Sequence, residues 1–452
     1  MRSLFFTRSG LDHLFSSLFQ FVFLLLIFFL PTQFGKHFWP DFSFIAGIRI
    51  DYLSPTLFFT DILLALLLVG FFVHFFLSQK KRKVTASRLS MLRQHGVLVL
   101  SLLGVMLGVL LSSRPPLGMY GLLRLTEIVC FAFLTKRFLE HIPQGFLKIA
   151  LVFSGALMFE STIGFLQFIT QHSLGGLLYF VGERAISLQT PGAANASIGG
   201  SLLLRPYGTF SHPNVFSGYL FIGNMLLIHA LPAVRKNWEK TLFVLALGCS
   251  SAILLLTLSR IALILYFVFI LVFSVYLLAK KKARKGLKSY VISVMVFIAL
   301  LSVALPFLLP RFQMAEIAGE SLQERMLLMR VSLQMITEHL VFGLGAGQFL
   351  VSLPHYLGKT LSFPLLQPVH NIYLLFLAET GIAGGLLFFL FFQSAITNIK
   401  KKKSVFLLLL FLFTLLLGVA DHYLLTLQQG RLLLGLVCGI VFSKAKSSLA
   451  AA

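Results

Sequence analysis

Residues 241–279, TLFVLALGCSSAILLLTLSRIALILYFVFILVFSVYLLA, decide the fold class of this sequence. The stretch is apolar throughout, but it is far longer than the roughly 20 residues that an α-helix needs to cross a bilayer. Lys240 and Lys280 flank its two ends, so it must cross an even number of times to keep both on one side. We therefore predict two membrane spans joined by a turn at Ser259-Arg260.

The whole chain shares this composition. It has 452 residues, of which 58% are hydrophobic and only 12% are charged, and its mean hydropathy is +0.91. These values predict an all-α integral membrane protein. Its three cysteines, Cys130, Cys249 and Cys438, lie in apolar runs, which argues against a disulfide framework or a zinc site.

Apolar runs of suitable length predict about twelve transmembrane helices. The first run has no small-residue cleavage site before Pro31, so we interpret it as a retained span and not as a signal peptide. The predicted spans are 14–30, 56–77, 96–113, 117–135, 145–170, 214–233, 241–258, 261–279, 289–309, 371–396, 404–420 and 430–443.

Basic residues orient this bundle. The net charge is +23, and most of the 38 Lys and Arg residues cluster at every second boundary between predicted spans. This is the positive-inside pattern, and it predicts that both termini are cytoplasmic. Because the basic residues are divided among separate short loops, they indicate topology and contact with anionic lipid, and they exclude a nucleic-acid-binding protein.

The predicted outer face carries two long connections. We interpret residues 1–452 as a single polytopic membrane domain with an outer loop at 171–213 and a longer outer loop at 310–370. The longer loop has the apolar spacing of amphipathic helices that lie at the membrane interface, followed by a predicted turn at Gly343, Gly345 and Gly347. Long loops of this kind usually carry function.

Arginines concentrate on the same face. Burying an unpaired charge at a membrane boundary is costly, so such residues indicate a function, and several arginines together favour a diphosphate ligand. Some have structural alternatives: Arg260 could bind helix-end carbonyls, and Arg330 could pair with Glu324 or Glu338. The predicted outer arginines are Arg205, Arg260, Arg311, Arg325 and Arg330.

One histidine stands out among the outer polar residues. His370 ends the long loop just before a predicted span, beside Asn371 and Tyr373, and a neutral imidazole there could accept a proton from a sugar hydroxyl. His212 is instead interpreted as a turn residue. Pro213 and Asn214 predict a helix start with Asn214 as the cap.

Five separated stretches resemble the signature segments of the O-antigen ligase and polymerase superfamily. They are RPYGTFSHPN, LTLSRIALIL, ERMLLMRVSLQMITEHLVFGLGAGQF, HNIYLLFLAETGIAG and DHYLLTLQQG, in that order between residues 145 and 440. The resemblance implies a GT-C-like glycosyltransferase of the cytoplasmic (inner) membrane that acts on its outer, periplasmic side in cell-envelope polysaccharide biosynthesis. Such enzymes move a glycan from an undecaprenyl-diphosphate carrier to an acceptor lipid, glycan or protein, without a cofactor and without an obligatory metal.

The resemblance also implies roles for individual residues. Arg205 and Arg325 occupy the positions of the two arginines that bind the diphosphate, and His370 occupies that of the catalytic histidine. Supporting roles are expected for Arg260, Tyr373, Glu324, Asp421 and His422. For Asp421, capping of a helix is an alternative to a place in the acceptor site. Glu316, Glu320 and Glu324 are four residues apart, which is typical of a helix face and not of a metal site.

Three functions remain open at this stage. A ligase and a polymerase of lipid-linked repeat units differ only in the acceptor, and the sequence does not separate them. A transporter of the lipid-linked oligosaccharide is disfavoured, because the charged residues gather on one face and not at mid-membrane. A non-catalytic partner in envelope assembly predicts that removal of His370 leaves glycan output unchanged.

Overall fold

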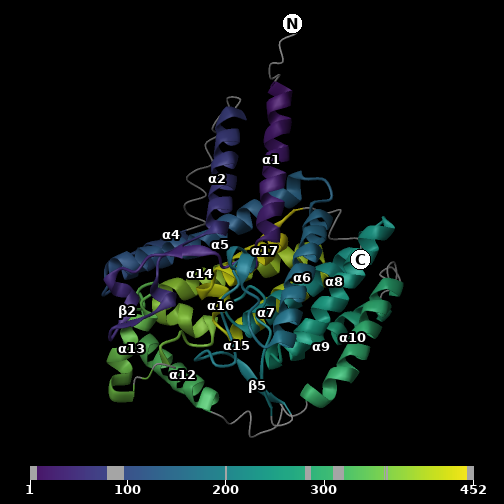
Figure 1. The fold of residues 1–452 in the computed structure, drawn as a ribbon. Helices are drawn as coiled ribbons and strands as arrows, with labels where there is room; N and C mark the ends of the chain where they lie inside the picture. The colour runs from purple at the N-terminus through teal and green to yellow at the C-terminus, as the bar shows by residue number, and fades with distance from the viewer. Residues whose placement is uncertain are drawn as a thin grey trace.

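A computed structural model describes residues 8–78, 96–198, 201–279, 287–308, 320–360, 362 and 365–444. The chain forms a bundle of apolar helices with three short β-hairpins (Figure 1). Arg311 and Glu316, and the basic cluster at 80–93, lie outside the described residues.

The bundle contains the following long helices. The first half of the chain supplies α1 (Arg8–Phe28), α2 (Phe59–Ser78), α4 (Gly96–Leu110), α5 (Pro115–His141), α6 (Gly145–Thr170), α7 (Pro213–Ala230) and α8 (Asn237–Leu256). The second half supplies α9 (Arg260–Ala279), α10 (Leu287–Leu308), α12 (Glu320–Glu338), α13 (Phe349–Leu357), α14 (Ile372–Lys402), α15 (Val405–Ala420), α16 (Tyr423–Thr426) and α17 (Gln428–Phe442).

Each predicted span coincides with one of these helices. Seven helices in the described part of the chain are long and apolar enough to cross a membrane: α2, α5, α6, α7, α8, α9 and α14. The apolar stretch 241–279 divides as predicted, because α8 ends at Leu256 and α9 begins at Arg260. Leu258 makes this tight turn with a left-handed backbone, at φ 52°.

Helix α7 lies at the centre of the bundle. Nearly all its residues are buried, including the large side chains of Phe216, Tyr219 and Phe221. A helix that is apolar on every side needs neighbours on every side, and α6, α8, α9 and α15 provide them. Helix α17 packs most extensively against α5, and Gly435 and Gly439 permit this close approach.

The glycine-rich turn after α12 docks onto a break in α14. Gly381 leaves the helical conformation (φ 58°, ψ −157°), and a side chain there would lie 2.6 Å from the main chain of Val341 and Gly343. Gly343, Gly345 and Gly347 all have positive φ, which confirms the predicted turn. Main-chain hydrogen bonds join the two segments, from Leu344 to Ala378 and from Ile382 to Leu340. This junction fixes α12 relative to α14, which begins just after His370.

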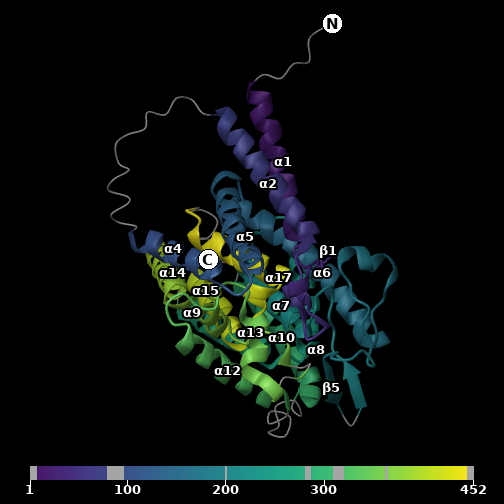
Figure 2. The same cartoon turned by 90° about the vertical axis from the view of Figure 1, so that its left-hand side faces the viewer.

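The connections gather at one end of the bundle, which we call the loop face. It includes residues 31–58, 171–198, 257–259 and 421–427. The strands there form three antiparallel pairs, β1 (Gly35–His37) with β4 (Thr56–Phe58), β2 (Phe44–Ile45) with β3 (Ile48–Arg49), and β5 (Asn195–Ile198) with β6 (Ser201–Leu204). Helix α12 and strand β5 lie at the end of the molecule opposite the start of α1 (Figures 1 and 2).

Candidate functional site

A polar cavity of about 450 Å³ opens at the loop face. Its walls come from distant parts of the chain: residues 33–58, Tyr120, residues 184–192 and 211–215, Arg325, and residues 367–370 and 421–431. Four predicted spans and both predicted outer loops therefore contribute to one site. Among the residues that the sequence singled out, the cavity brings together Arg325, His370, Asp421, His422 and His212.

Several side chains that line the cavity contain a buried polar atom without a hydrogen-bond partner in the described part of the chain. They are Gln33 (Nε2), Ser211 (Oγ), Arg325 (Nε), His370 (Nδ1), Tyr423 (Oη), Gln429 (Nε2) and Arg431 (Nε). Buried polar atoms in folded proteins nearly always have a partner, so a group of exceptions around one cavity indicates a polar ligand.

His370, Asp421 and His422 form a compact cluster in this cavity. Each offers a nitrogen or carboxylate oxygen, and these atoms lie within 4.8 Å of one another. The two imidazole rings meet edge to face at 5.1 Å between centroids. Asp421 accepts a hydrogen bond from the main-chain N–H of His422 at 2.8 Å, and the Nδ1 atom of His422 lies 2.7 Å from the hydroxyl of Thr426.

The surroundings set the charge of these groups. Burial lowers the pKa of His370 to about 3, more than the nearby Asp421 carboxylate raises it. The pKa of His422 is lowered by burial as well. Burial opposes ionisation of Asp421, but its electrostatic interactions with the neighbouring histidines and Arg325 outweigh burial and lower the pKa of this carboxyl. At neutral pH the cavity therefore contains a neutral His370 beside an ionised Asp421.

Arg325 supplies positive charge on the other side of this cluster. It projects from α12 into the cavity, and its Nε atom has no hydrogen-bond partner among the described residues. The position agrees with the expectation that Arg325 binds an anionic group. Its neighbour Glu324 does not line the cavity, and Arg330 is exposed farther along the same helix.

Arg205 occupies a different place from the one its predicted role requires. It is 6% exposed and does not line the cavity. Its Nε atom donates to the carbonyl of Thr257 at 2.6 Å, and one terminal nitrogen donates to the Oδ1 atom of Asn214 at 2.9 Å. The Nδ2 atom of Asn214 then donates to Asp421 at 3.3 Å. Arg205 thus reaches the site through Asn214, one layer behind the cavity wall.

The start of α7 explains this arrangement. The prediction that Asn214 caps α7 is wrong: His212 is the cap, and its Nδ1 atom accepts the main-chain N–H of Asn214 at 3.1 Å. The Asn214 side chain is therefore available to connect Arg205 with Asp421. The imidazole of His212 also faces the cavity, so this residue is closer to the site than the sequence indicated.

The other predicted supporting residues lie outside the cavity lining. Arg260 begins α9 directly after the 257–259 turn. Tyr373 donates its hydroxyl to the carbonyl of Leu415 at 2.8 Å and so joins α14 to α15. Glu160 is buried and accepts hydrogen bonds from the main chain and the side chain of Thr209 at 2.9 Å and 2.8 Å. That contact fixes the turn that precedes α7.

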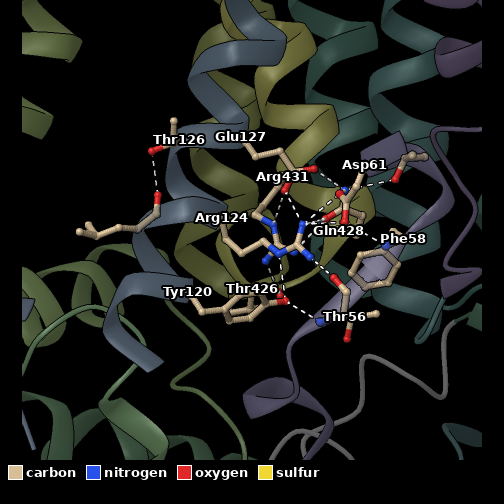
Figure 3. Close-up of polar contacts among 12 residues, drawn as sticks. Thr56, Phe58, Asp61, Tyr120, Arg124, Thr126, Glu127, Thr426, Gln428 and Arg431 are labelled. Atoms are coloured by element: carbon tan, nitrogen blue, oxygen red, sulfur yellow. Dashed lines mark hydrogen bonds and ion pairs between the residues drawn. The ribbon is translucent and has the colours of Figure 1, made fainter. Parts of the chain in front are cut away.

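A buried ion network under the cavity was missed by the sequence reasoning (Figure 3). Arg124 donates to both carboxylate oxygens of Asp61, at 2.9 Å and 3.0 Å, and to Glu127 at 3.1 Å. Arg431 lies 3.6 Å from Glu127. Gln428 bridges the two sides, because it donates to Asp61 and Glu127 and accepts from Arg431.

This ion network fixes the floor of the cavity. Arg431 also donates to the carbonyl of Thr426 at 2.9 Å, next to His422 and Tyr423. The network contains two arginines, Arg124 and Arg431, and two carboxylates, Asp61 and Glu127, so its positive charges are compensated. The sequence did contain a signal for the network, since Arg124 and Glu127 are charged residues three apart in an apolar span.

Among the described residues, His370, Asp421 and His422 could together hold a metal ion. Two imidazoles and one carboxylate are a ligand set that Zn²⁺ accepts. Both oxygens of the carboxylate accept hydrogen bonds, from Asn214 and from the main chain of His422. Arg325 adds positive charge at the same cavity, and that charge favours an anion there.

Comparison with known proteins agrees with the resemblance described above. Residues 244–389 match the family described as O-antigen ligase. The matched region runs from α8 into α14 and includes Arg325 and His370, whereas Arg205 and Asp421 lie outside it. No curated protein matches the chain. The match over these residues supports the predicted resemblance to the O-antigen ligase and polymerase superfamily.

Proposed function

We propose that this protein transfers a glycan from an undecaprenyl-diphosphate carrier to an acceptor at the loop-face cavity. In this proposal the loop face is the outer, periplasmic side of the cytoplasmic membrane, both termini are cytoplasmic, and the bundle is a GT-C-like glycosyltransferase. The observation that supports it best is the single cavity that holds Arg325 together with His370 and Asp421.

The chemistry needs a positive group for the departing diphosphate. The acceptor hydroxyl oxygen attacks the anomeric carbon, the bond from that carbon to the diphosphate oxygen breaks, and the diphosphate leaves with the electron pair. Arg325 stays protonated even in a poorly hydrated site and can contact phosphate oxygens through two nitrogens. Positive charge fixed where negative charge develops is usually the largest single contribution to such a reaction.

His370 is proposed to take the proton of the acceptor hydroxyl. Burial lowers its pKa to about 3, so the ring is neutral and its nitrogen is free to accept a proton. A bound diphosphate brings negative charge into the cavity and raises this pKa toward a value suited to a general base. Asp421, ionised in the same cluster, would stabilise the imidazolium that forms. Arg205 and Asn214 are proposed to position Asp421 from behind.

Ligation and polymerisation share this step and differ only in the molecule that provides the hydroxyl. We propose the ligase reaction, with an acceptor lipid, glycan or protein, and polymerisation of lipid-linked repeat units as its alternative. The proposed reaction needs no cofactor and no metal ion, because arginine supplies the charge and histidine the base.

Reconstitution in liposomes tests the proposal. The assay supplies an undecaprenyl-diphosphate-linked oligosaccharide with candidate acceptors and measures the glycoconjugate formed. We expect Arg325→Ala and His370→Ala each to lower turnover by about 100-fold or more. Arg330→Ala on the same helix and His355→Ala on α13 are matched controls, because both side chains are exposed and lie outside the cavity. Equal rates for the site variants and their controls would contradict the assignment.

A further inference from the structure

The cavity has a second set of polar groups opposite in character to the first. Arg325, His370, Asp421 and His422 are ionisable, whereas Gln33, Ser211, Tyr423 and Gln429 are amides and hydroxyls. We propose that these four residues, the neutral wall, form a subsite that binds one sugar ring through its hydroxyl or acetamido groups. This inference rests on the proposed function and names the part of the substrate that the neutral wall recognises.

Two of the four residues, Gln33 and Ser211, come from turns that are joined by a hydrogen bond. The hydroxyl of Thr209 donates to the carbonyl of Pro31 at 3.2 Å, which joins the turn before Ser211 to the turn that carries Gln33. Ser211 leads into α7, and Val215, one turn into that helix, also lines the cavity. The neutral wall therefore begins where the end of α1 meets the start of α7.

Tyr423, in α16, and Gln429, in the first turn of α17, complete the neutral wall. A Cβ atom built on Gly218 of α7 would lie 2.0 Å from the hydroxyl oxygen of Tyr423, so the tyrosine packs directly against this helix. A Cβ atom on Gly430 would lie 2.0 Å from the carbonyl oxygen of Tyr423, which brings the first turn of α17, with Gln429, equally close. Glycine at both positions permits this close packing, and both Tyr423 and Gln429 line the cavity.

Each member of the neutral wall has an unused hydrogen-bonding atom. These atoms are the amide nitrogens of Gln33 and Gln429 and the hydroxyl oxygens of Ser211 and Tyr423, and none has a partner among the described residues. Tyr423 and Gln429 are 2% and 3% exposed, so water reaches them poorly. Buried polar atoms without partners are costly, and four around one surface are best explained by a ligand that supplies the missing bonds.

The chemistry of the neutral wall fits a sugar better than a phosphate. Amides and hydroxyls of this kind donate to neutral hydroxyl or carbonyl oxygens, and a hydroxyl also accepts a bond in return. The arginines of the floor, Arg124 and Arg431, are compensated by Asp61 and Glu127, so no excess positive charge lies beneath the neutral wall. Phosphate is therefore expected at Arg325 and the sugar ring at the neutral wall.

Binding measurements on the full-length protein in detergent test this inference. The probes are a short-chain polyprenyl diphosphate, the same lipid carrying one N-acetylhexosamine, and a free oligosaccharide. The variants are Tyr423→Phe and Gln429→Met, which keep the size of the side chain but remove the donor. Tyr219→Phe is the matched control, because its hydroxyl is also buried without a partner among the described residues but does not line the cavity.

We expect each site variant to weaken binding of the sugar-bearing lipid about five-fold, the effect of one neutral hydrogen bond, and to leave the sugar-free lipid unchanged. A loss confined to the free oligosaccharide would support the subsite and assign it to the acceptor's sugar. The inference is overturned if both lipids lose affinity equally, if no sugar ligand responds, or if Tyr219→Phe has the same effect. Failure of the wild-type protein to bind the sugar-free diphosphate would contradict the proposed function instead.

Discussion

The buried ion network under the cavity makes a quantitative prediction for Glu127→Gln. Glu127 is 7% exposed and lies 3.1 Å from Arg124 and 3.6 Å from Arg431. The substitution keeps the shape of the side chain and removes its charge. Arg124 retains Asp61 at 2.9 Å, but Arg431 loses the carboxylate that compensates it. The two-plus-two balance becomes one uncompensated positive charge in a buried site.

The size of the effect follows from that imbalance. Removing one partner of a buried ion pair costs about 3–5 kcal/mol, because the other charge remains without compensation. Arg431→Met leaves the opposite imbalance and also removes the donors to Thr426 and Gln428. The double variant restores balance, since Asp61 and Arg124 still pair. We therefore expect the double variant to lose about 2–3 kcal/mol less free energy of unfolding than the sum of the losses in the two single variants.

Unfolding by sodium dodecyl sulfate from mixed micelles, with the free energy of unfolding measured for all four proteins, completes this double-mutant cycle. Asp51→Asn is the control: Asp51 lies 3.4 Å from a basic residue, Arg184, and both side chains of that pair are exposed. Its loss should cost less than about 1 kcal/mol. Additive costs for Glu127→Gln and Arg431→Met would refute the shared charge balance.

Three further predictions follow from the cavity. Asn214→Ala breaks the hydrogen-bonded link from Arg205 to Asp421 and should misplace the cluster of His370, Asp421 and His422. We expect kcat to fall by about 100-fold while KM for the donor stays within about two-fold. An unchanged kcat in steady-state kinetics would count against the link. Burial lowers the pKa of His370 from 6.5 to about 3, so between these pH values the unfolded chain binds more protons than the folded protein, and the stability of the fold should decrease as the pH drops through that window. In thermal unfolding, His370→Gln should make this decrease with pH shallower. An unchanged dependence on pH would argue against a neutral His370. Treatment with EDTA should leave turnover unchanged, whereas loss of turnover restored by a divalent cation would reassign His370, Asp421 and His422 to metal binding.

The helices could be predicted from the sequence because lipid imposes a simple requirement. Each crossing needs a long apolar run, and the backbone hydrogen bonds of a helix close within the run itself. For that reason the division of 241–279 at residues 257–259 was predictable, and so was the glycine turn after α12. Both features depend on residues that are close in the sequence and not on long-range contacts.

Positions in the site depended on long-range contacts and were predicted less well. Arg205 was expected in the cavity, but its place is set by the start of α7 meeting the 257–259 turn, a contact that no local pattern encodes. The role of Asn214 changed because His212, two residues before it, took the capping position. Arg431 needed the packing of α17 against α5 before Glu127 could be recognised as its partner.

The most direct test of the account is the stoichiometry of a single turnover. Wild-type protein in liposomes is mixed with less than one equivalent of undecaprenyl-diphosphate-linked glycan and a saturating acceptor, and both products are quantified. We predict that one free undecaprenyl diphosphate appears for each glycan transferred, and that Arg325→Ala forms neither product. Donor that is bound or moved across the bilayer intact, with no diphosphate released in the wild type, would contradict glycan transfer at this cavity.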